Sequence, residues 1–152
     1  RGSLEKDNYV LLKQGDLPRH EMIEMFKMSN KAVLFGTDSF WEGLDVQGEQ
    51  LKSVILVKLP FKVPNDPVTE AIIENIKKSG KNPFNDYQVP QAVIKFKQGV
   101  GRLIRSKDDK GSIIILDNRV IKKIYGKKFL KSLPKNIIEK SKKEILEMME
   151  LE

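Results

Sequence analysis

The sequence predicts an α/β fold with a mainly parallel sheet. Two short runs, at Val54 to Leu59 and Ser112 to Leu116, are almost continuously apolar, as is typical of strands that are covered on both faces. Segments with helical spacing of apolar residues lie between the apolar runs, and alternation of strands with helices favours parallel pairing. With 152 residues, the chain has the length of one domain and can bury a core without disulfides.

Composition excludes several function classes. Cysteine is absent, which excludes disulfides, thiolate metal sites and a cysteine nucleophile, and fits a reducing compartment. No signal peptide and no membrane-spanning apolar run is found, so we expect a cytoplasmic protein without a membrane partner. The net charge of +7 favours an anionic partner, most often a nucleic acid or a nucleotide.

The first third of the chain predicts a strand, a helix and a second strand. Residues 1–3 resemble a cloning remnant and are left out of the fold. Tyr9 to Leu12 is an apolar run, and Met22 to Phe26 has the apolar spacing of an amphipathic helix. Ala32 to Phe35 predicts the next strand. His20 is expected to be exposed at the helix start, and a single histidine without a second ligand is a poor metal site.

The middle of the chain carries clear helix signals. Pro60 ends the strand that begins at Val54, and Asp66 with Pro67 forms an N-cap and first helical position. This helix is predicted to run to about Lys78 and to end at Gly80. Residues 81–88 are predicted to form a polar loop.

The stretch QGVGRLIR, from Gln98 to Arg105, gives the clearest hint of chemistry. In a helix from about Pro90, the spacing i, i+4, i+7 places Gln98, Arg102 and Arg105 on one face. The opposite face is apolar and is formed by Val93, Phe96, Val100 and Leu103. Gly99 and Gly101 are costly inside a helix, which suggests close approach of another group to the backbone.

Two arginines on one face suit an anion with several oxygens, such as a transferring phosphoryl group, because the guanidinium stays charged and donates paired hydrogen bonds. Alternatively, these arginines pair with nearby carboxylates, for which the sequence offers Asp108, Asp109 and Asp117. Asp117 stands at the carboxyl end of the second buried strand, where ligand-contacting groups collect in open α/β sheets.

The C-terminal part is basic. Residues 119–135 hold seven Lys or Arg and no acid, which predicts either a solvated surface or a contact to a phosphate backbone. Asn136 and Glu139 resemble a capping box that opens an amphipathic helix, expected to serve core packing rather than a partner.

A second candidate site is the loop that reads SFWEGLDVQG. It places Glu42 and Asp45 around Gly43, next to Trp41 and Phe40. Exposed aromatic rings stack on unpaired bases, and carboxylates hold ribose hydroxyls or orient an arginine. The alternatives are that Trp41 anchors the loop in the core and that the acids only cap turns. A metal set of Asp38, Glu42 and Asp45 matches no standard ligand loop.

Together, FGTDSFWEGLDVQG and QGVGRLIRS resemble motifs V and VI of superfamily 2 DNA helicases in the DinG/XPD branch, with the DinG type most similar. KLPF at 58–61, ILDNR at 115–119 and YGKKFLKSLP at 125–134 extend the resemblance in the order and spacing of DinG-like proteins. It covers about residues 9–134.

The resemblance implies a RecA-like three-layer domain over residues 4–152, the second motor domain of a larger helicase, without the motif IV strand that normally opens it. Arg102 and Arg105 would reach the γ-phosphate of ATP bound mainly by the first RecA-like domain of the same polypeptide. Gln98 would lie near the nucleotide, and Gly101 would permit close approach of the triphosphate.

In motif V, the resemblance implies that Gly43 and Asp45 face the phosphates or the ribose, with Glu42 at the adjacent coupling position. The neighbouring residues of the loop would meet single-stranded DNA, namely Ser39, Phe40 and Trp41.

The chain contains no GxxxxGK[ST] phosphate loop and no DEAH-type acidic box, so we expect it to hold neither ATP nor Mg²⁺ tightly and to bind no metal itself. The expected function is that of a C-terminal motor domain of an ATP-dependent DNA helicase that moves 5′ to 3′, inactive as an ATPase in isolation. A non-enzymatic nucleic-acid-binding module and a metal-dependent phosphoesterase remain alternatives.

Overall fold

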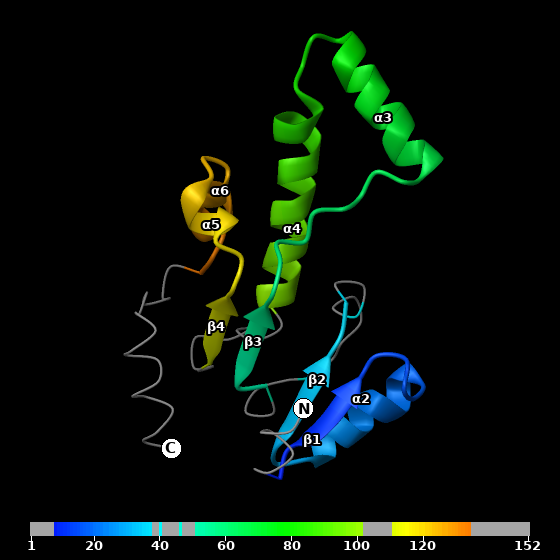
Figure 1. The fold of residues 1–152 in the computed structure, drawn as a ribbon, viewed down its shortest axis with the longest axis vertical. Coiled ribbons are helices and arrows are strands. Elements are labelled where there is room, and N and C mark those ends of the chain that lie inside the picture. The colour runs from blue at the N-terminus through cyan, green and yellow to red at the C-terminus, as the bar shows by residue number, and fades with distance from the viewer. Residues whose placement is uncertain (1–7, 38–39, 41–45, 47–50, 102–110, 135–152) are drawn as a thin grey trace.

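A computed structural model describes residues 8–37, 40, 46, 51–101 and 111–134, and it has the α/β architecture that the sequence predicts (Figure 1). Within these ranges, four strands form two parallel pairs, one near the N-terminus and one in the second half of the chain. Helices connect the two strands of each pair, as parallel pairing requires.

The N-terminal unit is a β-α-β arrangement. Strand β1 (Val10–Lys13) pairs with β2 (Ala32–Phe35), and α2 (Arg19–Met28) crosses between them. Helix α2 buries Met22 and Phe26, which lie one helical turn apart. They pack in a cluster with Leu12, Phe40, Val46 and Leu51. The two strands and the helix predicted for this region are confirmed.

The second unit pairs β3 (Ser53–Leu56) with β4 (Ser112–Ile115). Between them lie α3 (Pro67–Lys78), the π-helix η3 (Phe84–Gln88) and α4 (Val89–Val100). Two short helices follow β4, namely α5 (Arg119–Lys122) and α6 (Gly126–Lys131). Figure 1 shows α4 alongside β3 and β4, while α3 stands apart from both sheets.

The core of this unit joins α4, the strands and α6. Its buried residues are Leu56, Leu59, Val89, Ala92, Phe96, Val100, Val120 and Phe129. Val54 and Ile113 pack against both this cluster and the N-terminal one. The two cores are therefore continuous through the β3–β4 pair.

Helix α3 has the ends that the sequence predicts. The Asp66 carboxylate accepts a hydrogen bond from the Thr69 backbone N–H at 2.9 Å, and Pro67 occupies the first turn. At the other end Gly80 has φ of 74°, and its N–H and that of Lys81 donate to carbonyls of the last turn. This pattern is a Schellman motif, which requires a left-handed residue that glycine adopts without strain.

Two predictions about elements are wrong. The predicted polar loop at 81–88 is largely helical, because Asn82 caps Asn85 at 3.1 Å, Pro83 supplies a first-turn residue, and Phe84 packs on Phe61. The strand predicted from Val54 to Leu59 ends at Leu56.

The two strands of the second pair are also less buried than predicted. In β3, Ile55 is 56% exposed whereas Leu56 is only 2% exposed, and the four residues of β4 are half-buried. The predicted strand residue Leu116 lies just after β4 and is 60% exposed. Among the described residues each sheet has two strands, so side chains that alternate away from α4 meet little cover.

Candidate functional site

The last turn of α4 carries the described part of QGVGRLIR. Gln98 is exposed, whereas its neighbours Phe96, Gly99 and Val100 are buried, so the polar and apolar faces predicted for this helix are confirmed as far as Val100. The helix ends there with Gly101 as its C-cap. Val93 is half-buried against the core. Arg102, Leu103 and Arg105 lie outside the described residues.

Gly101 has a local steric role. Its N–H donates to the Lys97 carbonyl at 2.8 Å, and a Cβ at this position would lie 3.0 Å from that oxygen. Its φ of −66° is ordinary for any residue. A crowded helix end therefore gives a reason for glycine that does not depend on an approaching ligand.

Phe40 does not form an exposed stacking surface, and that part of the prediction is corrected. Its side chain is 5% exposed and packs in the N-terminal core. The Arg19 guanidinium lies 5.0 Å from its ring centroid, and Arg19 Nη2 donates to the Phe40 carbonyl at 3.0 Å. Arg19 is 21 positions away, and no sequence signal identified it as a support of this loop.

The strand end before this loop is also held in place. The Gln14 side-chain oxygen accepts from the Thr37 N–H at 2.7 Å and from its hydroxyl at 3.0 Å. The other predicted residues of the loop, Ser39, Trp41, Glu42, Gly43 and Asp45, lie outside the described residues.

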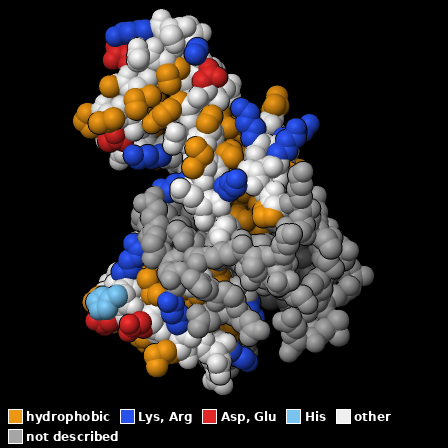
Figure 2. Space-filling view, turned by 180° about the vertical axis from the view of Figure 1, so that it is seen from behind, with side chains coloured by type: hydrophobic (Ala, Val, Ile, Leu, Met, Phe, Trp, Pro, Cys, Tyr) orange, Lys and Arg blue, Asp and Glu red, His pale blue; other side chains and the backbone are white. Residues whose placement is uncertain are grey.

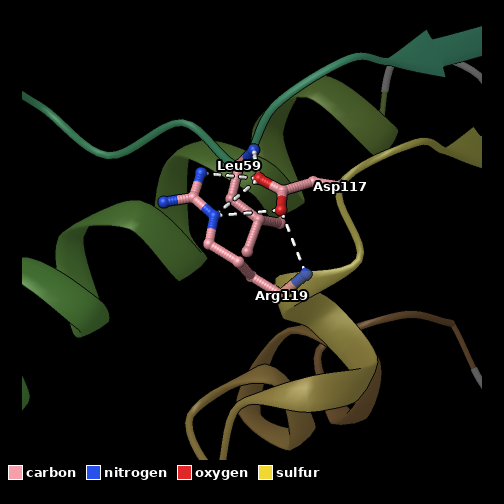
Figure 3. Close-up of polar contacts among 3 residues, drawn as sticks. All are labelled: Leu59, Asp117 and Arg119. Atoms are coloured by element: carbon pink, nitrogen blue, oxygen red, sulfur yellow. Dashed lines mark hydrogen bonds and ion pairs between the residues drawn. The ribbon is translucent and has the colours of Figure 1, made fainter.

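Asp117 lies at the carboxyl end of β4, as predicted, but its carboxylate is used within the fold (Figure 3). Oδ2 accepts from the Leu59 N–H at 2.9 Å and from Arg119 Nη2 at 2.6 Å. Oδ1 accepts from the Arg119 backbone N–H at 3.1 Å and from its Nε at 2.9 Å. Asp117 therefore ties the segment after β3 to the start of α5.

These contacts explain the shifted pKa values of Asp117 and Arg119. The Arg119 side chain, followed by the backbone N–H groups of Leu59 and Arg119, holds the pKa of Asp117 well below its usual range, against a smaller opposing effect of burial. Asp117 in turn raises the pKa of Arg119. Sequence reasoning missed this partner, although the residues stand only two positions apart.

Aromatic side chains add further contacts between the segment after β3 and the helices after β4. The Arg119 guanidinium lies 5.5 Å from the Phe61 ring centroid. Phe61 stacks on Phe84 and makes edge contacts with Tyr125 and Phe129, all with centroids within 5.8 Å. The segments KLPF, ILDNR and YGKKFLKSLP thus meet at one place, although they are far apart in sequence.

The candidate metal residues stay largely untested. No group of three potential ligands occurs among the described residues, and Asp38, Glu42 and Asp45 lie outside them. The His20 side chain is 78% exposed, as predicted, with its Nε2 3.8 Å from a Glu21 carboxylate oxygen. Among the residues that the structure describes, no helix is both long and apolar enough to cross a membrane.

Residues 1–136 match the family described as helicase C-terminal domain. The chain is 49% identical over 130 residues, or 86% of its length, to the ATP-dependent DNA helicase YoaA of Haemophilus influenzae. It is 49% identical over 114 residues, or 75% of its length, to the 3'-5' exonuclease DinG of Bacillus subtilis. The ATP-dependent DNA helicase DinG of Photobacterium profundum is 47% identical over 143 residues, or 90% of the chain.

The chain spans 20%, 12% and 21% of the lengths of these three relatives. Its parallel strands and intervening helices are those of a RecA-like α/β domain, which confirms the predicted fold class. The chain belongs to the helicase C-terminal domain family and is a DinG- and YoaA-like member of it.

Proposed function

We propose that this chain is the second motor domain of a longer ATP-dependent DNA helicase, and that it contributes motifs V and VI to ATP hydrolysis. The observation that carries the proposal is that QGVGRLIR begins with the exposed Gln98 in the last turn of α4, in a chain 49% identical to an ATP-dependent DNA helicase over 86% of its length. In the sequence, Arg102 follows directly after the helix cap and Arg105 comes three positions later.

The proposed chemistry is charge stabilisation. Arg102 and Arg105 donate hydrogen bonds to the γ-phosphate as its negative charge spreads during transfer, which lowers the barrier only when the two motor domains close around the nucleotide. Because Gln98 is exposed, its side-chain amide can form a hydrogen bond with the nucleotide or with the water that attacks the γ-phosphate. Mg²⁺, held mainly by the first motor domain, would neutralise phosphate charge.

Motif V is proposed to connect this chemistry to DNA. Gly43 and Asp45 face the nucleotide, Glu42 lies between the two functions, and Ser39 and Trp41 contact the single strand. Phe40 anchors the loop from inside the core, where Arg19 holds it. Alternating contacts of this loop would move the protein 5′ to 3′ along single-stranded DNA.

The test uses the full-length protein that carries this chain. Arg102→Ala and Arg105→Ala are expected to lower DNA-stimulated kcat by on the order of 10³-fold or more, as for other arginine fingers, with little change in affinity for single-stranded DNA. Lys27→Ala removes an exposed cation from α2 and serves as the control. Wild-type turnover by either arginine variant would refute the assignment.

A strand-displacement assay tests the direction. Duplexes with a 5′ single-stranded tail should be unwound, and those with a 3′ tail should not. The opposite preference would reject the 5′ to 3′ direction and leave the ATPase assignment standing.

A further inference from the structure

A hollow of about 610 Å³ lies on the surface of α5 and α6, and none of the residues that line it belongs to motif V or VI. This α5–α6 hollow is lined by Asn85, Lys122, Lys123, Ile124, Tyr125 and Lys128. Its volume falls within the range of pockets that hold small ligands, about 300–1,000 Å³. Half of its lining side chains are lysines.

The backbone beneath the hollow is held firmly. Lys123 is extended after α5, its N–H donates to the Arg119 carbonyl at 3.1 Å, and its own carbonyl accepts from Gly126 at 2.9 Å. Gly126 is buried, and any Cβ there would overlap the Val120 carbonyl, so the chain turns tightly at this point. Lys122 and Lys123 precede this turn and Lys128 follows it.

Tyr125 forms a fixed wall of the hollow. Its ring makes edge contacts with Phe61, Phe84 and Phe129, so it is committed to the aromatic cluster. After Asp117, the Tyr125 side chain also contributes to raising the pKa of Arg119. A ligand in the hollow would therefore contact the lysine side chains, because the Tyr125 ring is packed against other aromatic rings and is not available for stacking.

The lysines of the hollow have no acidic partner in the part of the chain that the structure describes. Among those residues no ion pair includes Lys122, Lys123 or Lys128, and the sequence of residues 119–135 contains no acid. The neighbouring Asp117 is already occupied by Arg119. Figure 2 shows Lys and Arg side chains around a hydrophobic one over α5 and α6, with no acidic side chain among them.

Ile124 lies among these lysines with 93% of its surface exposed. It adds an apolar contact beside the charges, and a nucleotide offers the matching pair of groups in its phosphate and its sugar. Lysine ammonium groups bind phosphates as point charges, without the bidentate geometry that reads base edges. Such a site would bind a backbone without regard to sequence.

We propose that the α5–α6 hollow binds consecutive phosphates of single-stranded DNA and forms a second contact to the strand, separate from motif V. The hollow follows the carboxyl end of β4, the edge at which ligands bind in α/β sheets. This inference rests on the proposed helicase function, and the experiment below separates the two.

The experiment compares two triple variants of the full-length protein. Lys122→Gln/Lys123→Gln/Lys128→Gln removes the three lysine charges from the hollow. The control Lys27→Gln/Lys77→Gln/Lys81→Gln removes three charges that are also exposed, from α2 and the end of α3. Binding of a fluorescent oligo-dT is measured between low and moderate salt. Melting temperatures confirm that both variants fold.

Each phosphate contact to a single strand contributes about −0.7 to the slope of log K against log salt concentration. The hollow variant should therefore bind on the order of tenfold more weakly, with a slope less negative by roughly 2. The control variant should retain the wild-type slope. In the ATPase assay, the hollow variant should need more DNA for half-maximal stimulation while reaching the wild-type kcat.

Equal salt slopes for the two variants would overturn the inference. A second binding assay uses an acidic peptide: if the hollow variant lost affinity for this peptide but kept wild-type affinity for oligo-dT, the inference would also be overturned. If the wild-type protein shows DNA-stimulated ATPase activity and the hollow variant binds DNA as the wild type does, only the second DNA contact is rejected. A wild-type protein without DNA-stimulated ATPase would instead reject the proposed function.

Discussion

At the scale of single residues, Asp117 does the most to organise the described structure. One carboxylate joins the backbone after β3 to both the main chain and the side chain of Arg119. Because the Asp117 side chain is 7% exposed, loss of its charge would weaken hydrogen bonds that water has little access to replace. Its position at a strand end therefore serves stability, and the predicted ligand contact gains no support.

Asp117→Asn is expected to lower the free energy of unfolding by about 1–3 kcal/mol at pH 7, the cost of weakening buried hydrogen bonds to a charged group. The folded-state pKa lies below the unfolded value of about 3.9, so the carboxylate stabilises the fold fully above that value. This contribution disappears as the pH falls through the folded pKa. The difference between wild type and variant in urea unfolding should therefore shrink below about pH 4.

Asp16→Asn is a suitable control, because Asp16 is exposed in the turn after β1. It should show little change at either pH. A difference for Asp117→Asn that stays constant from neutral to acid pH would mean that the ion pair with Arg119 does not stabilise the fold.

Gly126→Ala is expected to be among the most damaging single changes in the chain. The new Cβ would overlap backbone atoms of Val120 and Arg119, which cannot move away as a flexible side chain would. Destabilisation of about 3 kcal/mol or more is expected from such overpacking. Chemical denaturation measures it.

Gly101→Ala provides the comparison, since among the described residues its Cβ meets a single tight contact, at 3.0 Å. A loss well below that of Gly126→Ala is expected. Equal losses would contradict the steric argument. Any loss of turnover in Gly101→Ala must therefore be compared with its loss of stability before it is attributed to the nucleotide.

At the scale of elements, η3 and α4 form one continuous helical segment that begins near Asn82. The Asn82 side chain caps the Asn85 N–H, and its own N–H donates to the Asp86 carboxylate at 2.9 Å. Replacing such a cap by alanine typically costs about 1 kcal/mol. Asn82→Ala should lower stability by that amount in urea unfolding.

Asn82→Asp retains a side-chain acceptor at the cap and should remain close to wild type. If both variants lost the same stability, the cap would not be what stabilises this end of the helix.

Sequence signals located elements well where the determinants are local. Asp66 with Pro67 and Gly80 marked both ends of α3, and the comparable Asn-Pro pair that begins at Asn82 would have located the next helix. The polar composition of residues 81–88 favours a loop instead and masks this helix signal. Strand burial was overestimated, because the sequence does not show how many strands flank each one.

Site geometry was predictable only along one helix. The exposed Gln98 beside buried Phe96 and Val100 follows from helical periodicity. The Phe40 carbonyl accepts from Arg19, 21 positions away, and the Asp117 carboxylate accepts from the Leu59 N–H, 58 positions away, as well as from the nearby Arg119. Contacts over such distances come from tertiary packing, which local patterns do not encode.

At the scale of the whole molecule, the proposed active site is shared between two domains. The chain has no phosphate loop, so its arginines would complete a site whose nucleotide is held elsewhere. The isolated 152-residue chain is therefore expected to show no appreciable ATPase activity, with or without single-stranded DNA. A phosphate-release assay beside the full-length protein checks this, and robust DNA-stimulated turnover by the isolated chain would contradict it.

The pairing of β3 with β4 constrains how the second half of the chain folds. The Leu59–Asp117 hydrogen bond joins residues 58 positions apart, so forming this part of the fold includes the entropy cost of closing a long loop. Distant contacts of this kind slow folding. During synthesis, β3 can pair with β4 only after residue 115 has been added, whereas the β1–α2–β2 unit lies within residues 10–35. Exposed positions on α3, inside the closing loop but outside the core, should therefore hardly affect the folding rate.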